Sequence, residues 1–248
     1  MNLGIDGRVA LVMGASRGIG RGVAEALAAE GARVAISSRS AERLGEVAAE
    51  LGATAFAADT GDLERMAALP GEVGEALGPV EILVANTGGP PTGGALENPA
   101  EEWEAAYRSL VLAPRMLVEA ALPGMRERRW GRIVNVASSS VREPIPSLAL
   151  SNVHRMAAVG FLKTLAAEVA RDGITVNTVA TGRFATDRLK DDQGSLEAAE
   201  ESARESVPAG RLGRPEEFGD LVAFLASERA AYLTGAVIPL DGGMLRSV

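Results

Sequence analysis

Seven short apolar runs recur along the chain, and longer amphipathic segments separate most of them. The runs are apolar at nearly every position, which is typical of strands covered on both faces. A segment such as IGRGVAEALAAEG, which ends at Gly31 as a helix C-cap, has apolar residues three and four apart and predicts a helix. The runs lie at residues 8–13, 33–37, 54–59, 81–86, 132–138, 175–180 and 236–241. Because crossovers join alternating strands and helices, the pattern predicts a doubly wound α/β domain with about seven parallel strands and helices on both faces.

Residues 1–248 are expected to form this domain as a single unit. The 248 residues are 47% hydrophobic, which is enough to bury a sizeable core at a length typical of one α/β domain. The formal net charge of −8 argues against a nucleic-acid-binding protein, because phosphate neutralisation requires a concentrated basic surface. The basic run at residues 125–132, MRERRWGR, is explained by a solvated helix end.

The usage of cysteine and histidine narrows the chemistry further. The chain has no cysteine, which excludes disulfides, thiol nucleophiles and thiolate metal sites. Its single histidine, His154, argues against a zinc site, and we expect no metal. No stretch reaches the roughly 20 apolar residues of a membrane span, and no basic region precedes the first apolar run. We therefore expect a soluble cytoplasmic protein that binds neither membranes nor nucleic acid.

A polar segment at residues 180–215 follows the sixth predicted strand, where open α/β sheets place their ligands. We expect its central part, residues 183–212, to form a mobile substrate lid. A plain surface insertion is the alternative.

The connection between the first predicted strand and the first predicted helix is rich in glycine and reads VMGASRGIGRGVAEAL. Glycine permits a tight turn and a close backbone approach, and a helix N-terminus offers free N–H groups and partial positive charge to a phosphate. The G-x-x-x-G-x-G spacing in this context predicts a seat for the pyrophosphate of a dinucleotide, as in Rossmann-type domains. The predicted cofactor-binding residues here are Gly14, Ser16, Arg17, Gly18, Ile19 and Gly20.

The letters GASRG at residues 14–18 also match G-x-S-x-G, the nucleophile elbow of α/β hydrolases, with Ser16 as the nucleophile. An elbow in that fold normally follows several earlier strands, and only His154 is present as a base. A serine hydrolase is therefore a distant alternative.

The end of the second predicted strand bears on the choice of cofactor. An acidic residue there would hold the adenosine ribose 2′-hydroxyl of NAD, but Ser38 and Arg39 occupy the place. An arginine fork binds a 2′-phosphate through charge-assisted hydrogen bonds worth about 1.5–3 kcal/mol. We predict NADP(H) rather than NAD(H). The alternative is that Arg39 simply lies in solvent at a helix start.

Together these motifs resemble the short-chain dehydrogenase/reductase family, and most of all its 3-oxoacyl-(acyl-carrier-protein) reductases of fatty acid biosynthesis. The likeness covers nearly the whole chain, through GASRGIG, NTGG, RIVNVASSS, GITVNTVATG and the C-terminal VPAGRLGRPEEFGDLVAFLASERAAYLTGAVIPLDGG. It implies that Asp59 and Thr60 meet the adenine, and that Asn86 and Gly88 border the adenosine side of the cofactor. We favour the cofactor contact for Asp59, and the alternative is that it caps the start of a helix.

The resemblance further implies a homo-oligomer, a tetramer or a dimer, built through long helices. The segment at residues 106–125 is apolar over a broad face and would be shared between subunits. A helix buried within one chain would have the same pattern.

Family members use a tyrosine, a lysine four residues later on the same helix face, a serine on the preceding strand and a supporting asparagine. The likeness places the serine at Ser138. It places Ser151 at the tyrosine position, Arg155 at the lysine position and Leu110 at the asparagine position, while Thr181 replaces a proline. An aliphatic hydroxyl is a far weaker acid than a phenol, and arginine stays protonated, so the expected proton donor is missing.

The remaining candidates do not restore a proton donor. His154 lies about 100° around the predicted helix from Arg155, so we expect a surface or interface histidine. For Ser138, the alternative is a hydroxyl that serves the backbone at the strand end instead of a substrate. Tyr107 and Tyr232 lie outside the motif, and we assign them to packing.

Two hypotheses of function follow. The favoured one is an NADP(H)-dependent oxidoreductase with an altered active site, acting on the carbonyl or hydroxyl group of a small molecule or an acyl thioester. The other is a cofactor-binding relative without catalysis, such as a sensor or an oligomer partner. If an acidic acyl carrier protein delivers the substrate, its docking patch would consist of Arg126, Arg128 and Arg129.

Overall fold

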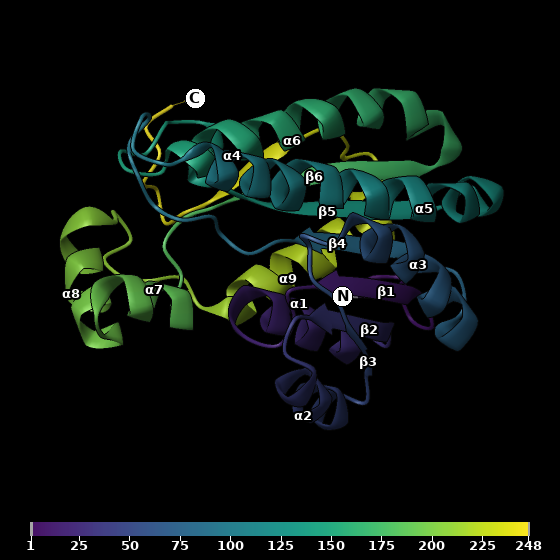
Figure 1. Cartoon of the computed structure of the whole chain (residues 1–248). Coiled ribbons are helices and arrows are strands. Elements are labelled where there is room, and N and C mark those ends of the chain that lie inside the picture. Colours follow the sequence, from purple (N-terminus) through teal and green to yellow (C-terminus); the bar gives the residue numbers. More distant parts are fainter. Residues whose placement is uncertain (1, 248) are drawn as a thin grey trace.

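The computed structural model describes residues 2–247, apart from the side chain of Asp192. Its single sheet has seven parallel strands in the order β3-β2-β1-β4-β5-β6-β7 (Figure 1). The strands are β1 (Val9–Met13), β2 (Arg33–Ser38), β3 (Thr54–Ala57), β4 (Ile82–Asn86), β5 (Gly131–Ser138), β6 (Ile174–Thr181) and β7 (Val237–Leu240). Each predicted apolar run forms one of these strands. The predicted doubly wound α/β domain is confirmed.

Helices cover both faces of the sheet and enclose two core layers. α1, α2 and α9 pack on one face, and α3, α5 and α6 pack on the other (Figure 1). The helices are α1 (Gly18–Ala29), α2 (Ala41–Leu51), α3 (Leu63–Leu77), α4 (Ala100–Tyr107), α5 (Ala113–Arg128), α6 (Ala149–Val169), α7 (Asp187–Gln193), α8 (Leu196–Ser206) and α9 (Pro215–Leu225). The strand order reverses between β1 and β4, and such a reversal places a ligand crevice at the carboxyl ends of these strands.

The apolar segment at residues 106–125 does not form one regular helix. α4 ends at Tyr107, a π turn spans Arg108–Leu112, and α5 begins at Ala113. Pro114 lacks the N–H that an α-helix would donate to the carbonyl of Leu110, which favours a wider turn at this point. The side chain of Leu110 is consequently buried between this turn and α6.

The polar segment after β6 folds into α7 and α8, which lie outside the two core layers (Figure 1). Arg183, just beyond β6, donates from Nη1 to the hydroxyls of Ser202 and Ser206 on α8, at 3.0 and 2.7 Å. A small apolar cluster that includes Ala199 and Ala203 closes the underside of α8. The segment therefore has a small apolar cluster, which Met244 near the C-terminus joins, while Phe184 packs into the main core. Its mobility stays a prediction.

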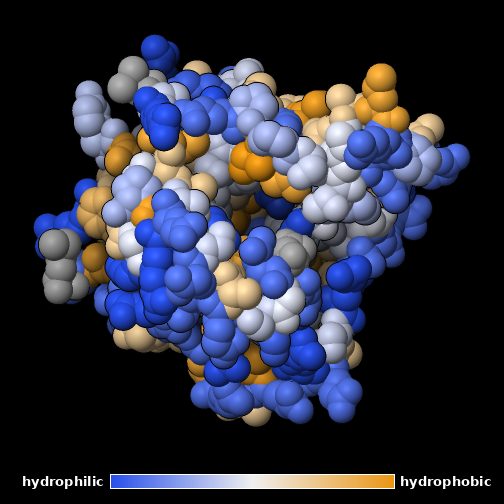
Figure 2. Space-filling view, turned by 90° about the vertical axis from the view of Figure 1, so that its left-hand side faces the viewer, coloured by the Kyte–Doolittle hydropathy of each residue, from blue (hydrophilic) through white to orange (hydrophobic). Residues whose placement is uncertain are grey.

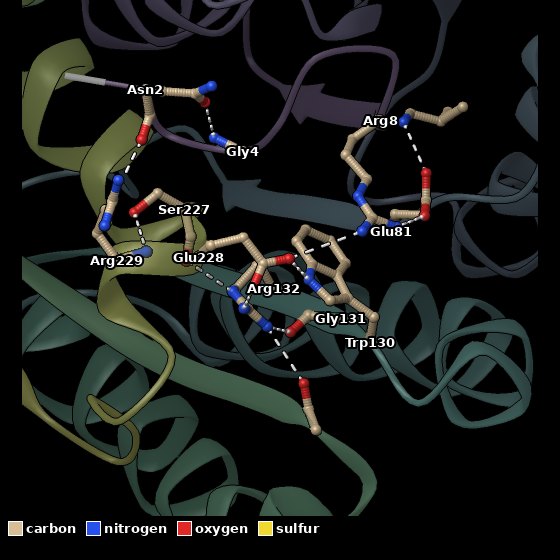
Figure 3. A network of polar contacts seen from close by, with 12 residues as sticks. Asn2, Gly4, Arg8, Glu81, Trp130, Gly131, Arg132, Ser227, Glu228 and Arg229 are labelled. Atoms are coloured by element: carbon tan, nitrogen blue, oxygen red, sulfur yellow. Dashed lines mark hydrogen bonds and ion pairs between the residues drawn. The ribbon is translucent and has the colours of Figure 1, made fainter.

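A network of charged side chains joins the elements at the amino ends of the strands (Figure 3). The ring of Trp130 lies between two guanidiniums, 4.1 Å from that of Arg8 and 4.3 Å from that of Arg132. Its Nε1 donates to Glu228 at 2.8 Å. Arg132 is almost completely buried and donates to three backbone carbonyls, those of Gly131, Gly173 and Ser227. This edge of the sheet is thus held by buried polar contacts, and it lies opposite the edge of the ligand crevice.

Candidate cofactor seat and active site

The glycine-rich loop between β1 and α1 has the geometry of a phosphate cradle. Gly14 and Gly18 adopt left-handed conformations, with φ of 63° and 55°. A Cβ on Gly14 would lie 2.8 Å from Nδ2 of Asn86, and a Cβ on Gly20 would overlap the carbonyl oxygen of Gly14. Side chains at these positions would therefore force the loop away from the end of β4. Since α1 begins at Gly18, the free N–H groups of its first turn border the loop.

The other predicted cradle residues take different positions. Arg17 is exposed, and its Nη1 lies 3.3 Å from Oδ2 of Asp187 on α7. Ser16 is only partly buried, whereas Ile19 packs against the core under α1. The cradle therefore offers backbone N–H groups, one hydroxyl and one exposed cation to a ligand.

The hydrolase alternative fails on the position of the histidine. His154 lies in α6, on the face of the sheet opposite α1, and is 6% exposed. Its Nδ1 lies 2.8 Å from the carbonyl oxygen of Leu150, and its ring lies beside Trp103 and Tyr107. Because it is the only histidine of the chain, Ser16 has no imidazole base. The expectation of a surface histidine is also wrong, because α6 begins at Ala149 and packs this side chain against α4, whereas the alternative of an interface histidine stays a prediction.

The assignment of both tyrosines to packing needs a correction. Tyr232 is fully exposed, and Tyr107 is 47% exposed although its ring lies beside His154. Together with Val153 and Met156 on α6, Tyr107 contributes exposed apolar surface on the side of α4 and α6.

The residues predicted for the adenosine side lie at the carboxyl ends of β2, β3 and β4. Ser38 ends β2, and Arg39 follows it with an exposed side chain. After β3, the carboxylate of Asp59 accepts from the backbone N–H of Gly61 at 2.8 Å, with Thr60 between them. The cap of α3 is Asp62, so Asp59 is not a helix cap. Since β1, β2 and β3 are neighbours in the sheet, these side chains and the cradle share one edge.

The four positions implied for catalysis lie on β5, α6 and the π turn. Ser138 ends β5, and its Oγ accepts from the backbone N–H of Ser140 at 3.1 Å, so this hydroxyl does serve the backbone while it can still donate its own proton. Ser151 lies in the first turn of α6 and is 6% exposed. Leu110 is buried against Ala106 and Leu150, where it offers no polar atom.

Arg155 lies one turn after Ser151 and is fixed by the backbone. Its Nη1 donates to the carbonyl of Val136 at 2.9 Å, and its Nη2 donates to the carbonyl of Gly88 at 3.3 Å. Burial and the nearby charge of Arg188 lower the pKa of Arg155 to about 10. The side chain therefore remains a cation at neutral pH and cannot shuttle a proton.

The start of α7 contacts both the glycine-rich loop after β1 and the loop after β4. The sequence did not predict these contacts. Asp187 pairs with Arg17 of the cradle, and Thr186 lies close to Gly18. Arg188 lies against Gly89 on the loop after β4, where a Cβ would overlap its guanidinium. The only signal for these contacts was the position of the polar segment directly after a strand end. They support the lid proposal, because the segment lies over the seat.

The surface at this edge agrees with a ligand site. Figure 2 faces the edge that lies on the left of Figure 1, and it shows a hollow near the centre that both hydrophilic and hydrophobic residues border. Among residues 2–247, no cluster of three or more histidine, aspartate or glutamate side chains is arranged to hold a metal ion. Within the same residues, no helix is both long and apolar enough to cross a membrane.

Comparisons with known proteins agree over the length of the chain. The family model described as enoyl-(acyl carrier protein) reductase matches residues 14–245. A 3-oxoacyl-(acyl-carrier-protein) reductase of Vibrio cholerae is 38% identical over 248 residues, which cover 98% of this chain and 99% of the relative. The same enzyme of Escherichia coli is 36% identical over 247 residues, with 98% and 99% coverage.

Solved structures show the same architecture. L-sorbose reductase of Gluconobacter frateurii, solved with NADPH and L-sorbose, superposes with a TM-score of 0.93 at 34% identity, covering 100% of both chains. An actinorhodin polyketide ketoreductase variant with NADPH superposes with a TM-score of 0.90 at 33% identity, covering 96% of this chain and 97% of the other. The fold, the cradle and the near-complete matches lead to one conclusion: the chain belongs to the short-chain dehydrogenase/reductase family.

Proposed function

We propose that this chain is an NADP(H)-dependent oxidoreductase that acts on a carbonyl or hydroxyl group through an altered active site. The observation that carries the proposal is the combination of a closely fitted glycine cradle with an exposed Arg39 at the end of β2. The residues fit the cofactor, because the left-handed Gly14 and Gly18 turn the loop tightly and the free N–H groups at the start of α1 can bind a pyrophosphate. Two similar structures, those of L-sorbose reductase and the polyketide ketoreductase, were solved with NADPH.

The residues of the chain divide the work of such a reaction. Bound NADPH would supply the hydride. The cradle would hold the pyrophosphate through backbone N–H groups, and Arg39 would hold the 2′-phosphate. The hydroxyl of Ser138 would donate a hydrogen bond to the substrate carbonyl, and the fixed cation of Arg155 would stabilise negative charge on the oxygen. No tyrosine or histidine stands at position 151, so we expect the proton to come from water and turnover to be slow.

A cofactor-binding relative without catalysis is the second candidate. It is favoured by the same three substitutions, since Ser151, Arg155 and Leu110 remove the proton donor and its relay while the cofactor seat is kept. This candidate predicts tight cofactor binding with no turnover on any carbonyl compound. The homo-oligomer and the cytoplasmic location remain predictions under both candidates.

Titration with NADPH and with NADH tests the proposal directly. We expect NADPH to bind about ten- to a hundredfold more tightly than NADH, because only NADPH carries the phosphate that Arg39 can pair with. Nicotinamide fluorescence would follow binding, and calorimetry would check the stoichiometry. If folded protein binds neither nucleotide, the cradle is a structural remnant and the oxidoreductase proposal is wrong.

An acyl carrier protein is the proposed partner if the substrate is an acyl thioester. Arg126, Arg128 and Arg129 lie at the exposed end of α5. Arg126 pairs with Asp172 at 3.0 Å, whereas Arg128 contacts only a backbone carbonyl among the described residues. The match to acyl-carrier-protein reductases supports this partner.

Neutralising the three arginines together to glutamine is expected to weaken binding of an acyl carrier protein by about tenfold or more. The affinity for NADPH should stay unchanged, because α5 ends at the opposite edge from the cofactor seat. Surface plasmon resonance at two salt concentrations would measure carrier binding. Arg115→Gln, an exposed arginine on the same helix, is the control. If the natural chain, the triple glutamine variant and Arg115→Gln all bind the carrier protein equally, the three arginines are not its docking patch.

A further inference from the structure

Two arginine side chains from different elements meet beside the loop that follows β4. Arg155 on α6 is tied to Gly88, and Arg188 on α7 lies against Gly89, the next residue of the same loop. The Nη2 of Arg188 also lies 3.5 Å from the carbonyl oxygen of Pro90. The two charges interact, since the charge of Arg188 adds to burial in lowering the pKa of Arg155. Two like charges beside the same loop favour the binding of an anion that contacts both of them.

Arg155 has hydrogen-bonding capacity left for such an anion. A guanidinium carries five N–H donors in one plane, and within the described residues Arg155 uses two of them, toward Val136 and Gly88. The two backbone bonds fix the plane, so the remaining three donors are already oriented. A planar, fixed fork suits the two oxygens of a carboxylate.

The position of the pair along the sheet edge indicates which molecule carries the anion. Arg155 contacts the ends of β4 and β5, whereas the cradle follows β1 and Arg39 follows β2. Neighbouring strands lie about 4.8 Å apart, so the pair lies roughly 5–10 Å beyond the cradle, on the side away from Arg39. This step rests on the proposed function: a dinucleotide with its phosphates at Arg39 and the cradle has only its reacting end at the pair.

We propose that Arg155 and Arg188 form a binding site for a carboxylate that belongs to the substrate, so that the chain selects oxo acids and hydroxy acids. Ser138 follows Val136 by two residues, about 7 Å along β5. A carbonyl one or two carbons from a carboxylate held at the pair can therefore reach the hydroxyl of Ser138. An acyl thioester of the same length lacks this carboxylate and gains nothing from the pair.

Calorimetry with acetoacetate and methyl acetoacetate on protein loaded with NADP⁺, which cannot reduce a ketone, tests the site, because the two probes share a ketone and differ in charge. We expect acetoacetate to bind and the ester to bind far more weakly. Arg188→Gln should weaken acetoacetate binding by about ten- to a hundredfold and leave the ester unaffected. Lys190→Gln is the matched control, since it removes an equal charge from an exposed side chain of the same helix. Arg188 is itself exposed, so its replacement leaves the core intact. Arg155→Gln provides a second variant.

Three results would overturn the proposal. The acid and the ester bind alike, or Arg188→Gln and Lys190→Gln behave alike, or acetoacetate is displaced by NADPH, which would assign the pair to a cofactor phosphate. The same titrations on cofactor-free protein separate this proposal from the oxidoreductase proposal. If NADPH fails to bind while acetoacetate binding still depends on Arg188, the carboxylate site stands and the oxidoreductase proposal falls.

Discussion

The double variant Ser151→Tyr, Arg155→Lys is expected to reduce a 3-oxoacyl thioester about 10²- to 10⁴-fold faster than the natural chain, the range that a general acid contributes. A phenol has an ordinary pKa near 10, and a lysine one helical turn away lowers it by favouring the charged form. Positions 151 and 155 lie one turn apart at the start of α6, so the two new side chains share a face toward the end of β5. Oxidation of NADPH, followed by its absorbance, measures the rate.

The matched control for this variant is Ser151→Phe, Arg155→Lys, which introduces the same ring without the hydroxyl. It should stay at the natural rate, while both variants keep their affinity for NADPH. If the tyrosine variant binds NADPH and shows no gain over the phenylalanine variant, the substrate pocket has diverged together with the catalytic residues. Leu110 would then be the next position to change, because it replaces the polar residue of the relay with a buried apolar side chain.

Arg39→Asp is expected to invert the preference between the two cofactors. The loss of the cation should weaken NADPH binding by about ten- to a hundredfold, and the new carboxylate also repels the 2′-phosphate. The same carboxylate can accept from the ribose hydroxyls of NADH, so the affinity for NADH should rise. Fluorescence titration with both nucleotides measures the ratio of their dissociation constants.

Arg33→Asp is the control for the cofactor prediction. Arg33 lies at the amino end of the same strand with an exposed side chain, so the variant changes the net charge equally at a distance from the seat. The Arg33→Asp variant should have the same ratio of NADPH and NADH dissociation constants as the natural chain. A ratio that moves equally in both variants would mean that net charge, rather than a contact at Arg39, sets the preference.

The five inner strands could be predicted from the sequence because each is buried on both faces and is therefore apolar at nearly every position, whereas β3 and β7 lie at the two sides of the sheet and are only partly buried. The cradle could be predicted for a related reason: Gly14 and Gly18 need left-handed backbone, and few residues other than glycine adopt it. A local requirement of this kind can be recognised from the residue type at a single position of the sequence.

The features that the sequence did not reveal depend on contacts between distant segments. His154 is buried because α4 packs Trp103 against it, and nothing near position 154 records that contact. The Arg155–Arg188 pair joins α6 to a helix that begins some thirty residues later, so neither arginine stands out in its own segment. The π turn has a local cause in Pro114, yet the same proline also suits the first turn of an ordinary helix. Tyr232 shows the converse, because an aromatic residue does not by itself indicate burial.

The buried network around Trp130 and Arg132 lies at the amino ends of the strands, whereas the residues predicted to replace the family's catalytic side chains, Ser151, Arg155 and Leu110, lie at or near the opposite ends. The residues that stabilise the fold at the amino ends are therefore different from the residues proposed to act on the substrate. A lineage carrying this chain can exchange its catalytic side chains while the amino edge continues to hold the sheet together. Substitutions near the carboxyl ends of the strands can therefore change the substrate, or leave binding alone, while the fold stays intact.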